Sequence, residues 1–213
     1  MKRFRARVLS IALLALCTAA LWAQETTQKS ASSSSRPSAR SKASLAEPGA
    51  ISAGAYRNPS FGFSYKLSFG WVDRTKEMRD DSDTSKSLVL LAVFERPPEA
   101  RGDTVNSAVV IAAEALSAYS GVNTAADYFG PLTELTTTKG FQVVNQPYEF
   151  SLGPVRLVRA DFSKLRGTLT MYQTSLVMLE KGYAVSFTFI GGSDEEVNEL
   201  IEKLSLATRK SAR

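Results

Sequence analysis

Residues 169–206 read LTMYQTSLVMLEKGYAVSFTFIGGSDEEVNELIEKLSL and predict a strand, a turn, a second strand and a helix. The run Leu169–Leu179 is long, apolar and rich in β-favouring side chains. Lys181-Gly182 supplies the turn, because glycine adopts positive φ at no steric cost. In Tyr183–Phe189 bulky and small side chains alternate, so one face of the second strand carries the aromatic rings.

The helix after this hairpin has a clear start and one apolar stripe. Ser193 precedes Glu196 by three residues, which is the spacing of a capping box. The apolar positions that follow recur at helical spacing: Val197, Leu200, Ile201 and Leu204. Since the hairpin has one aromatic face and the helix one aliphatic face, we expect the two to pack together as the core.

Further strands and one helix precede this unit. The apolar or alternating runs that predict strands are Leu88–Phe94, Asn106–Ala115, Phe141–Phe150 and Val155–Phe162. Residues Ala112–Ala118 could also form a helix, but the β-branched residues just before them favour a strand. A helix is expected over Thr124–Lys139, with Thr124 and Asp127 as its cap and Gly130-Pro131 kinking or restarting it.

The first strand of the folded part lies in residues 56–71, YRNPSFGFSYKLSFGW. This segment resembles the opening of PsbP-like domains in Gly62-Phe63-Ser64 and in Gly70-Trp71, with Ser68 at the position of a usual proline. The PsbP-like fold is shared with a Ran-binding Mog-type nuclear-transport factor and with exported bacterial proteins. The order of strands and helices predicts an α+β protein with a mostly antiparallel sheet. The resemblance implies an α/β/α sandwich with a sheet of about six to seven strands.

The chain divides into four predicted parts. Residues 1–23 have the basic start, apolar stretch and small final residue of a signal peptide, with cleavage near Ala23. Residues 24–54 are rich in Ser, Ala, Lys and Arg and predict a disordered linker, so removing residues 24–50 should cost no stability. Residues 55–208 form the PsbP-like domain, and 209–213 form a basic tail. We therefore expect a periplasmic or secreted protein with no stable membrane span after cleavage.

Composition excludes several kinds of chemistry. The net charge of +5 comes from the N-terminal segment and the linker, so the domain has no basic excess for nucleic acid. The chain has no histidine, and its one cysteine, Cys17, lies in the predicted signal peptide. Ser-His pairs, Cys-His pairs, disulfides and structural zinc sites are thereby excluded, and no cofactor or metal is expected.

Two sets of acidic residues are candidate functional sites. Glu149, Asp161 and Glu180 lie in or near strands and would serve a small carboxylate- or Ser/Lys-dependent hydrolase if they converged. Exposed strand ends explain these carboxylates equally well. Asp80–Asp83 offers alternating acidic ligands for calcium, but the glycine and later glutamate of an EF-hand loop are missing, which favours a solvated loop.

A binding role is the preferred interpretation. Four basic residues on one strand and its turn could contact an anionic partner: Arg156, Arg159, Lys164 and Arg166. Odd spacing sends Arg156 and Arg159 to opposite faces of a regular strand, and protection of a sheet edge is the simpler role for such side chains. Trp71 suits ligand stacking, although a buried structural ring is the simpler prediction. The PsbP-like resemblance implies a non-catalytic module that acts through protein–protein contacts, with an unknown protein or an envelope component as partner.

Overall fold

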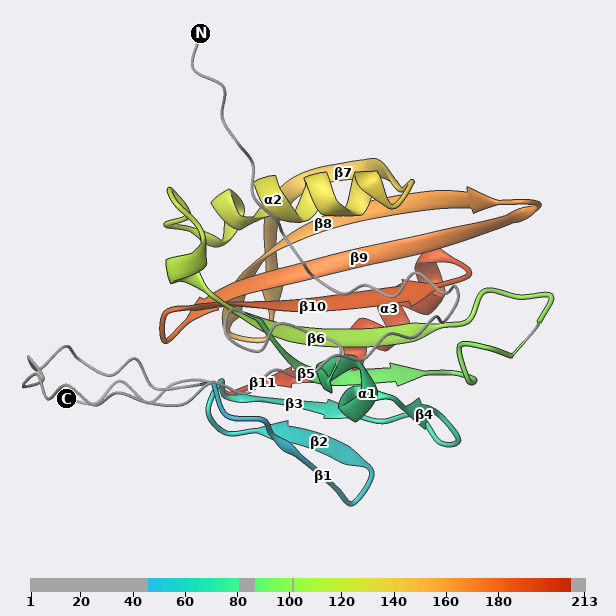
Figure 1. Ribbon diagram of the computed structural model, residues 1–213, viewed down its shortest axis with the longest axis horizontal. Coiled ribbons are helices and arrows are strands. Elements are labelled where there is room, and N and C mark those ends of the chain that lie inside the picture. Colours follow the sequence, from blue (N-terminus) through green and yellow to red (C-terminus); the bar gives the residue numbers. More distant parts are fainter. Residues whose placement is uncertain (1–45, 81–86, 101, 208–213) are drawn as a thin grey trace, which may run out of the picture.

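The computed structural model describes residues 46–80, 87–100 and 102–207, which form two antiparallel sheets and three α-helices (Figure 1). The large sheet has seven strands, in the order β4 (Val72–Asp73), β5 (Ser87–Phe94), β6 (Ala108–Ala115), β10 (Tyr183–Gly191), β9 (Leu169–Glu180), β8 (Val155–Arg166) and β7 (Gln142–Leu152). The small sheet has four strands, in the order β1 (Ala50–Ser52), β2 (Ala55–Asn58), β3 (Phe63–Lys66) and β11 (Leu204–Leu206). The helices are α1 (Thr75–Asp80), α2 (Ala125–Thr138) and α3 (Asp194–Glu202), and a 3₁₀ turn, η1 (Leu116–Ala118), follows β6.

The β9–β10 hairpin confirms the predicted central unit. Glu180 pairs with Tyr183, so Lys181 and Gly182 alone make the turn. Both residues have positive φ, at 51° and 82°, which is the geometry of a two-residue hairpin turn that follows the twist of the strands.

The aromatic face of β10 is fully buried by α3 and by the small sheet. Phe187 and Phe189 are 0% exposed, and their ring centroids lie 5.1 Å from Phe63 and 6.2 Å from Tyr65, respectively. The apolar stripe of α3 packs into the same cluster, which confirms the predicted pairing of hairpin and helix. Leu204 is buried there too, but it belongs to β11 because α3 has already ended at Glu202.

The opposite face of the large sheet is covered by α2 and α1. Thr124 and Asp127 form the full capping box at the start of α2, as predicted. The helix buries Tyr128, Phe129 and Leu132 and runs through Pro131 without a restart. The six-residue helix α1 was not predicted; it buries Met78 against β5.

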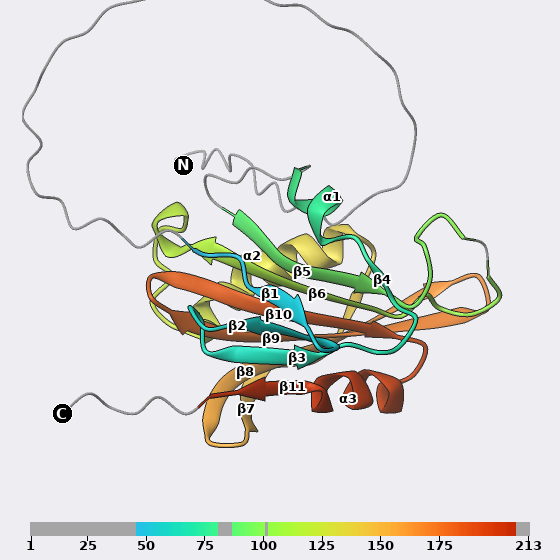
Figure 2. The ribbon, with the colours of Figure 1, turned by 90° about the horizontal axis from the view of Figure 1, so that it is seen from below.

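These elements form three layers with the large sheet in the middle (Figure 2). The α+β class and a sheet of about seven strands are confirmed. The third layer differs from the predicted sandwich, because the small sheet lies there beside α3. Strands of three or four residues carry too little periodicity to predict such a layer from sequence.

The structured part extends upstream of the predicted boundary at residue 55. β1 lies inside the segment predicted as linker, and the Ala46 amide donates to the Tyr183 hydroxyl over 3.1 Å. The predicted signal peptide, residues 24–45 of the predicted linker, Asp81–Asp83 and the predicted basic tail lie outside the described residues.

Both edges of the large sheet are irregular. β4 has two residues. β7 contains Pro147, and its pairing with β8 shifts between Val143 and Asn145 and again between Asn145 and Tyr148. β7 curves towards the side of the large sheet that carries α3 (Figure 2), as bulged strands do.

Candidate functional site

The four basic residues predicted as a binding set do not form one patch. Arg159 is 8% exposed and lies on the sheet face under α3, whereas Lys164 and Arg166 lie on the face under α2. Arg156 is exposed at the far end of β8, eight residues from Lys164, a distance of about 26 Å along a strand. Only Lys164 and Arg166 are therefore neighbours.

Arg159 instead forms a buried ion pair with Asp161, another of the predicted site residues. The Arg159 Nε donates to Asp161 Oδ1 over 2.8 Å, and Thr174 Oγ1 donates to the same oxygen over 2.6 Å. The irregular strand β7 supplies two more donors to Asp161 Oδ2, Asn145 Nδ2 and Tyr148 Oη, each at 3.0 Å.

This network holds Asp161 in its ionised form, and all its hydrogen bonds are made within the protein. Burial raises the pKa of Asp161, but the hydrogen bonds from Thr174, Arg159 and Asn145 outweigh burial and hold the pKa below its ordinary value. Arg159 Nη1 also donates to Asn198 Oδ1 of α3 over 3.1 Å. The Arg159–Asp161 pair thus links β7, β8, β9 and α3 through hydrogen bonds, so we assign it a structural role.

The three candidate carboxylates do not converge. By the strand register, Glu149 pairs with Val158 and lies on the α2 face of the sheet, whereas Asp161 and Glu180 lie on the other face. Asp161 pairs with Thr174, and Glu180 is six residues further along β9, about 20 Å away. No two of them form the close pair that glycoside or acyl hydrolysis by carboxylates requires.

Arg156 and Glu180 do share a hollow of about 430 Å³ at the turn end of the sheet. Lys181 and the β2–β3 turn residues Pro59–Gly62 complete much of its lining. The lining of this hollow contains one carboxylate and two cations, so its charge is of mixed sign and does not favour one class of ligand.

A second cavity, of about 510 Å³, lies on the α2 face between α1 and the C-terminal end of α2. Its floor comes from five strands of the large sheet, β5, β6, β8, β9 and β10. The lining residues are Met78, Phe94, Ala108, Val110, Thr138, Lys139, Phe141, Lys164, Arg166, Met171 and Ile190.

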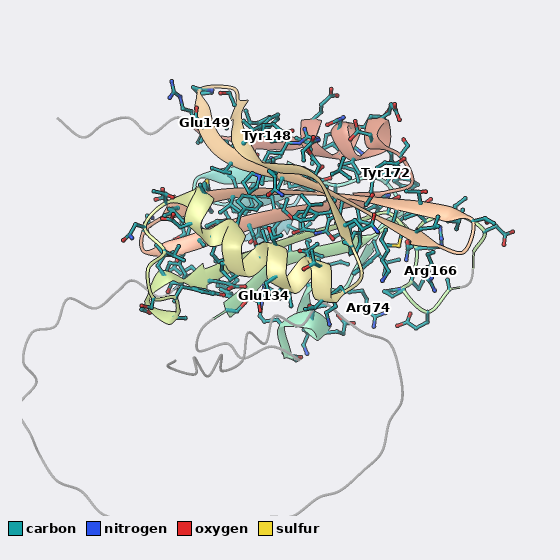
Figure 3. The ribbon with its side chains drawn as sticks, turned by 90° about the horizontal axis from the view of Figure 1, so that it is seen from above. Arg74, Glu134, Tyr148, Glu149, Arg166 and Tyr172 are labelled. Carbon is teal, nitrogen blue, oxygen red and sulfur yellow. The ribbon has the colours of Figure 1, made fainter. Side chains whose placement is uncertain are left out.

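Three cations lie at one side of this cavity: Lys139, Lys164 and Arg166. Among the residues that the structure describes, none of the three forms an ion pair, and no carboxylate lines the cavity. Lys164 Nζ donates to the Lys139 carbonyl over 2.6 Å, which places its charge at the negative end of the α2 dipole. Arg166 lies beyond that end of the helix (Figure 3).

Polar side chains are buried on the same face under α2: Glu114, Gln173, Ser175, Ser186 and Thr188. Glu114 accepts a hydrogen bond from the Tyr119 hydroxyl. Burial raises the pKa of Glu114 to about 7, and the nearby Tyr128 hydroxyl offsets part of this rise. The face under α2 therefore buries polar groups outside the Arg159–Asp161 network of the other face.

The sequence contained part of this site. Lys164 and Arg166 were predicted as partner-binding residues, and they line the cavity. The sequence did not point to Lys139, because this residue follows the last turn of a helix and belongs to no motif. It did not point to Phe94, Val110 and Ile190 either, because the sequence of a strand does not show which part of the sheet the helices leave uncovered. Trp71 is half-buried at the core edge, with Lys203 Nζ 5.9 Å from its ring centroid.

Two kinds of feature are absent from the described part of the chain. It contains no cluster of three or more potential metal-ligating side chains. None of its helices combines the length and apolarity that crossing a membrane would require.

Comparison with family models and with curated proteins gave no match. Solved structures gave distant likenesses. A Pseudomonas aeruginosa protein of unknown function, PA94, described as a putative regulator, is 15% identical over 53% of this chain and 80% of its own, with a TM-score of 0.37. A Bacteroides thetaiotaomicron protein is 14% identical over 74% of this chain and half of its own (50%), with a TM-score of 0.40.

The third is LpqN of Mycobacterium tuberculosis, described as involved in cell envelope biogenesis. It is 12% identical over 68% of this chain and 83% of its own, with a TM-score of 0.36. All three neighbours are bacterial, and scores at this level carry no argument about function. The PsbP-like resemblance stays a prediction.

Proposed function

We propose that this protein is an exported, non-catalytic binding protein whose ligand site is the cavity between α1 and the end of α2. Of the two partner classes expected from the sequence, a protein and an envelope component, the cavity fits the second. Export itself rests on the signal-peptide pattern of residues 1–23.

The carrying observation is the combination of an apolar floor with three converging cations. Ligand sites are commonly concave, mostly apolar, about 300–1,000 Å³ in volume and oriented by a few polar groups. The cavity beside α2 has about 510 Å³, and Lys139, Lys164 and Arg166 are its charged groups.

The buried ion pair argues against the hydrolase alternative. Asp161 already accepts four hydrogen bonds, and its lowered pKa makes it a poor base or acid near neutrality. Glu149 lies on the opposite face of the sheet, so it cannot assist Asp161 across a shared substrate.

The test fills the cavity with a larger side chain. Val110 is half-buried on the cavity floor, so Val110→Phe should occupy part of the volume without disturbing the rest of the core. Anilinonaphthalene sulfonate, an apolar anion whose fluorescence rises in apolar sites, should bind the folded wild type with one-to-one stoichiometry. We expect Val110→Phe to weaken this binding on the order of tenfold, equivalent to about 1.4 kcal/mol.

Val155→Phe is the matched control, because it makes the same change in the hollow at the other end of the sheet. It should leave probe binding unchanged, and thermal melting should show that both variants stay folded. Equal loss in both variants, or no binding to the folded wild type, would refute the proposed site.

A further inference from the structure

The cavity floor crosses the large sheet from β8 to β5. The apolar side chains along this path are Met171, Ile190, Val110, Phe94 and Met78. Four strand spacings of about 4.8 Å give a path of about 19 Å. An extended carbon chain advances roughly 1.2 Å per bond, so the path corresponds to about 16 bonds, and chains of about 10 to 14 carbons fit within it.

The lining excludes strongly polar ligands. Apart from the three cations, Thr138 contributes the one side-chain hydroxyl among the lining residues. A sugar or a nucleotide base would lose its hydrogen bonds to water on entering and would regain few of them, which disfavours binding. The two methionines, Met78 and Met171, are flexible side chains that adapt to an aliphatic chain.

The charges lie at one end of this path. Lys139 belongs to the end of α2 and Lys164 and Arg166 to the end of β8, so the cations lie together on the β8 side, and the apolar floor extends away from them. The adjoining hollow of about 610 Å³ shares Arg166 and Met171 but contains Glu99 and Asp103. The cation cluster thus favours an anion in the cavity beside α2 and not in its neighbour.

We infer that the ligand is a single-chain amphiphile with an anionic head group. The head group binds Lys139, Lys164 and Arg166, and the aliphatic chain crosses the floor towards α1. This inference rests on the proposed function, because it names the ligand class of the same cavity.

The experiment measures affinity by calorimetry on the purified full chain after removal of copurified lipid. The probes are decanoate, dodecanoate and tetradecanoate, each below its micelle concentration. Each buried methylene contributes about 0.8 kcal/mol, so affinity should rise about three- to fourfold per added carbon. Dodecyl phosphate should bind like dodecanoate, dodecanol more weakly, and dodecyltrimethylammonium weakest.

Two substitutions test the head-group contacts. Arg166→Gln and Lys139→Gln should each weaken dodecanoate binding about two- to fivefold, the range for partly exposed charges, and leave dodecanol binding unchanged. Lys164 is left intact because its ammonium caps α2. Arg156→Gln is the matched control, since Arg156 is an exposed arginine of the same strand outside the cavity.

The failure of this inference differs from the failure of the proposed function. Affinity that ignores chain length, or equal binding of dodecanoate and dodecyltrimethylammonium, would overturn the ligand class. If anilinonaphthalene sulfonate still binds wild type and is lost in Val110→Phe, the cavity stays the proposed site with another ligand. Loss of both kinds of binding refutes both proposals.

Discussion

The two faces of the large sheet carry different side chains and are covered in different ways. The face under α3 and the small sheet carries Phe187 and Phe189, and its cover encloses them completely. The face under α2 carries buried polar groups and is covered by α2 only over part of its area, with the cavity beyond its end. We therefore expect the face under α3 to supply more of the stability, and the proposed binding to use the space left open on the face under α2.

The largest expected effect comes from the aromatic face. Phe187→Ala should lower the free energy of unfolding by about 3–5 kcal/mol, because a fully buried ring leaves a void in a packed cluster. Leu200→Ala on α3 should cost about 2–5 kcal/mol for the same reason. Val110→Ala on the other face should cost about 1 kcal/mol or less, because the space beside it is already open. Urea unfolding measures all three, and equal costs on both faces would break the comparison.

The buried ion pair gives the next effect. Asp161→Ala should cost about 3 kcal/mol or more, because it leaves the Arg159 guanidinium buried without its partner. Glu149→Ala, at an exposed position, is the control and should change stability by about 0.5 kcal/mol or less. A cost for Asp161→Ala as small as the control would show that the pair does not tie α3 to the sheet.

Glu114 and Asp161 should respond to pH in opposite directions. The pKa of Glu114 is about 7 in the folded chain against about 4.3 in an unfolded one. Between these values the folded chain holds a proton that the unfolded chain has released, so stability falls as pH rises from about 4.5 to 7, by about 2–3 kcal/mol. Asp161, with its lowered pKa, contributes stability above the unfolded pKa that is lost as pH falls through the folded value.

Glu114→Gln isolates this effect. Urea unfolding is measured at pH 5 and at pH 8. Wild type should be less stable at pH 8 because of Glu114, and the variant should lack this part of the loss. A variant with the same pH dependence as wild type would mean that Glu114 is ionised in the fold throughout this range.

The smallest effect concerns the outer layer of the aromatic face. Removing residues 1–45 should leave stability unchanged, whereas removing residues 1–50 should cost about 1–3 kcal/mol. The second deletion takes away the Ala46 amide bond to Tyr183, the Glu47 carbonyl that accepts from Asn58, and the Gly49 amide that donates to Tyr56 over 2.9 Å. Because of these contacts we now expect residues 46–50 to contribute to stability, in contrast to the sequence-based prediction that residues 24–50 are dispensable. Equal melting temperatures for the two deletions would contradict this.

Much of the large sheet was readable from sequence because its signals are local. The alternation in Tyr183–Phe189, the Lys181-Gly182 turn and the Thr124 cap each act over a few residues. β1, β11 and α1 were missed because three to six residues do not complete a periodic pattern.

The candidate site was less predictable than the sheet. Arg159 looked like a surface cation, and what buries it is the bending of β7, which brings Asn145 and Tyr148 to its partner Asp161. The cavity depends on where α1 and α2 end over the sheet. That is a tertiary property of segments far apart in the chain, so Lys164 and Arg166 could be suspected but not assigned to a cavity.

The irregular edges of the large sheet have a consequence for self-association. An exposed edge strand with regular spacing is a template on which a second molecule can extend the sheet. β4 pairs with only Val93 and Phe94 of β5, and beyond it side chains of α1 cover the edge, because the Thr75 hydroxyl accepts from the Ala92 amide and the Arg79 guanidinium donates to the Val89 carbonyl. At the other edge, β7 is interrupted by two register shifts and by Pro147, which has no amide hydrogen to offer. Neither edge presents a continuous row of donors and acceptors, so concentrated protein should resist the cross-β aggregation that such edges initiate.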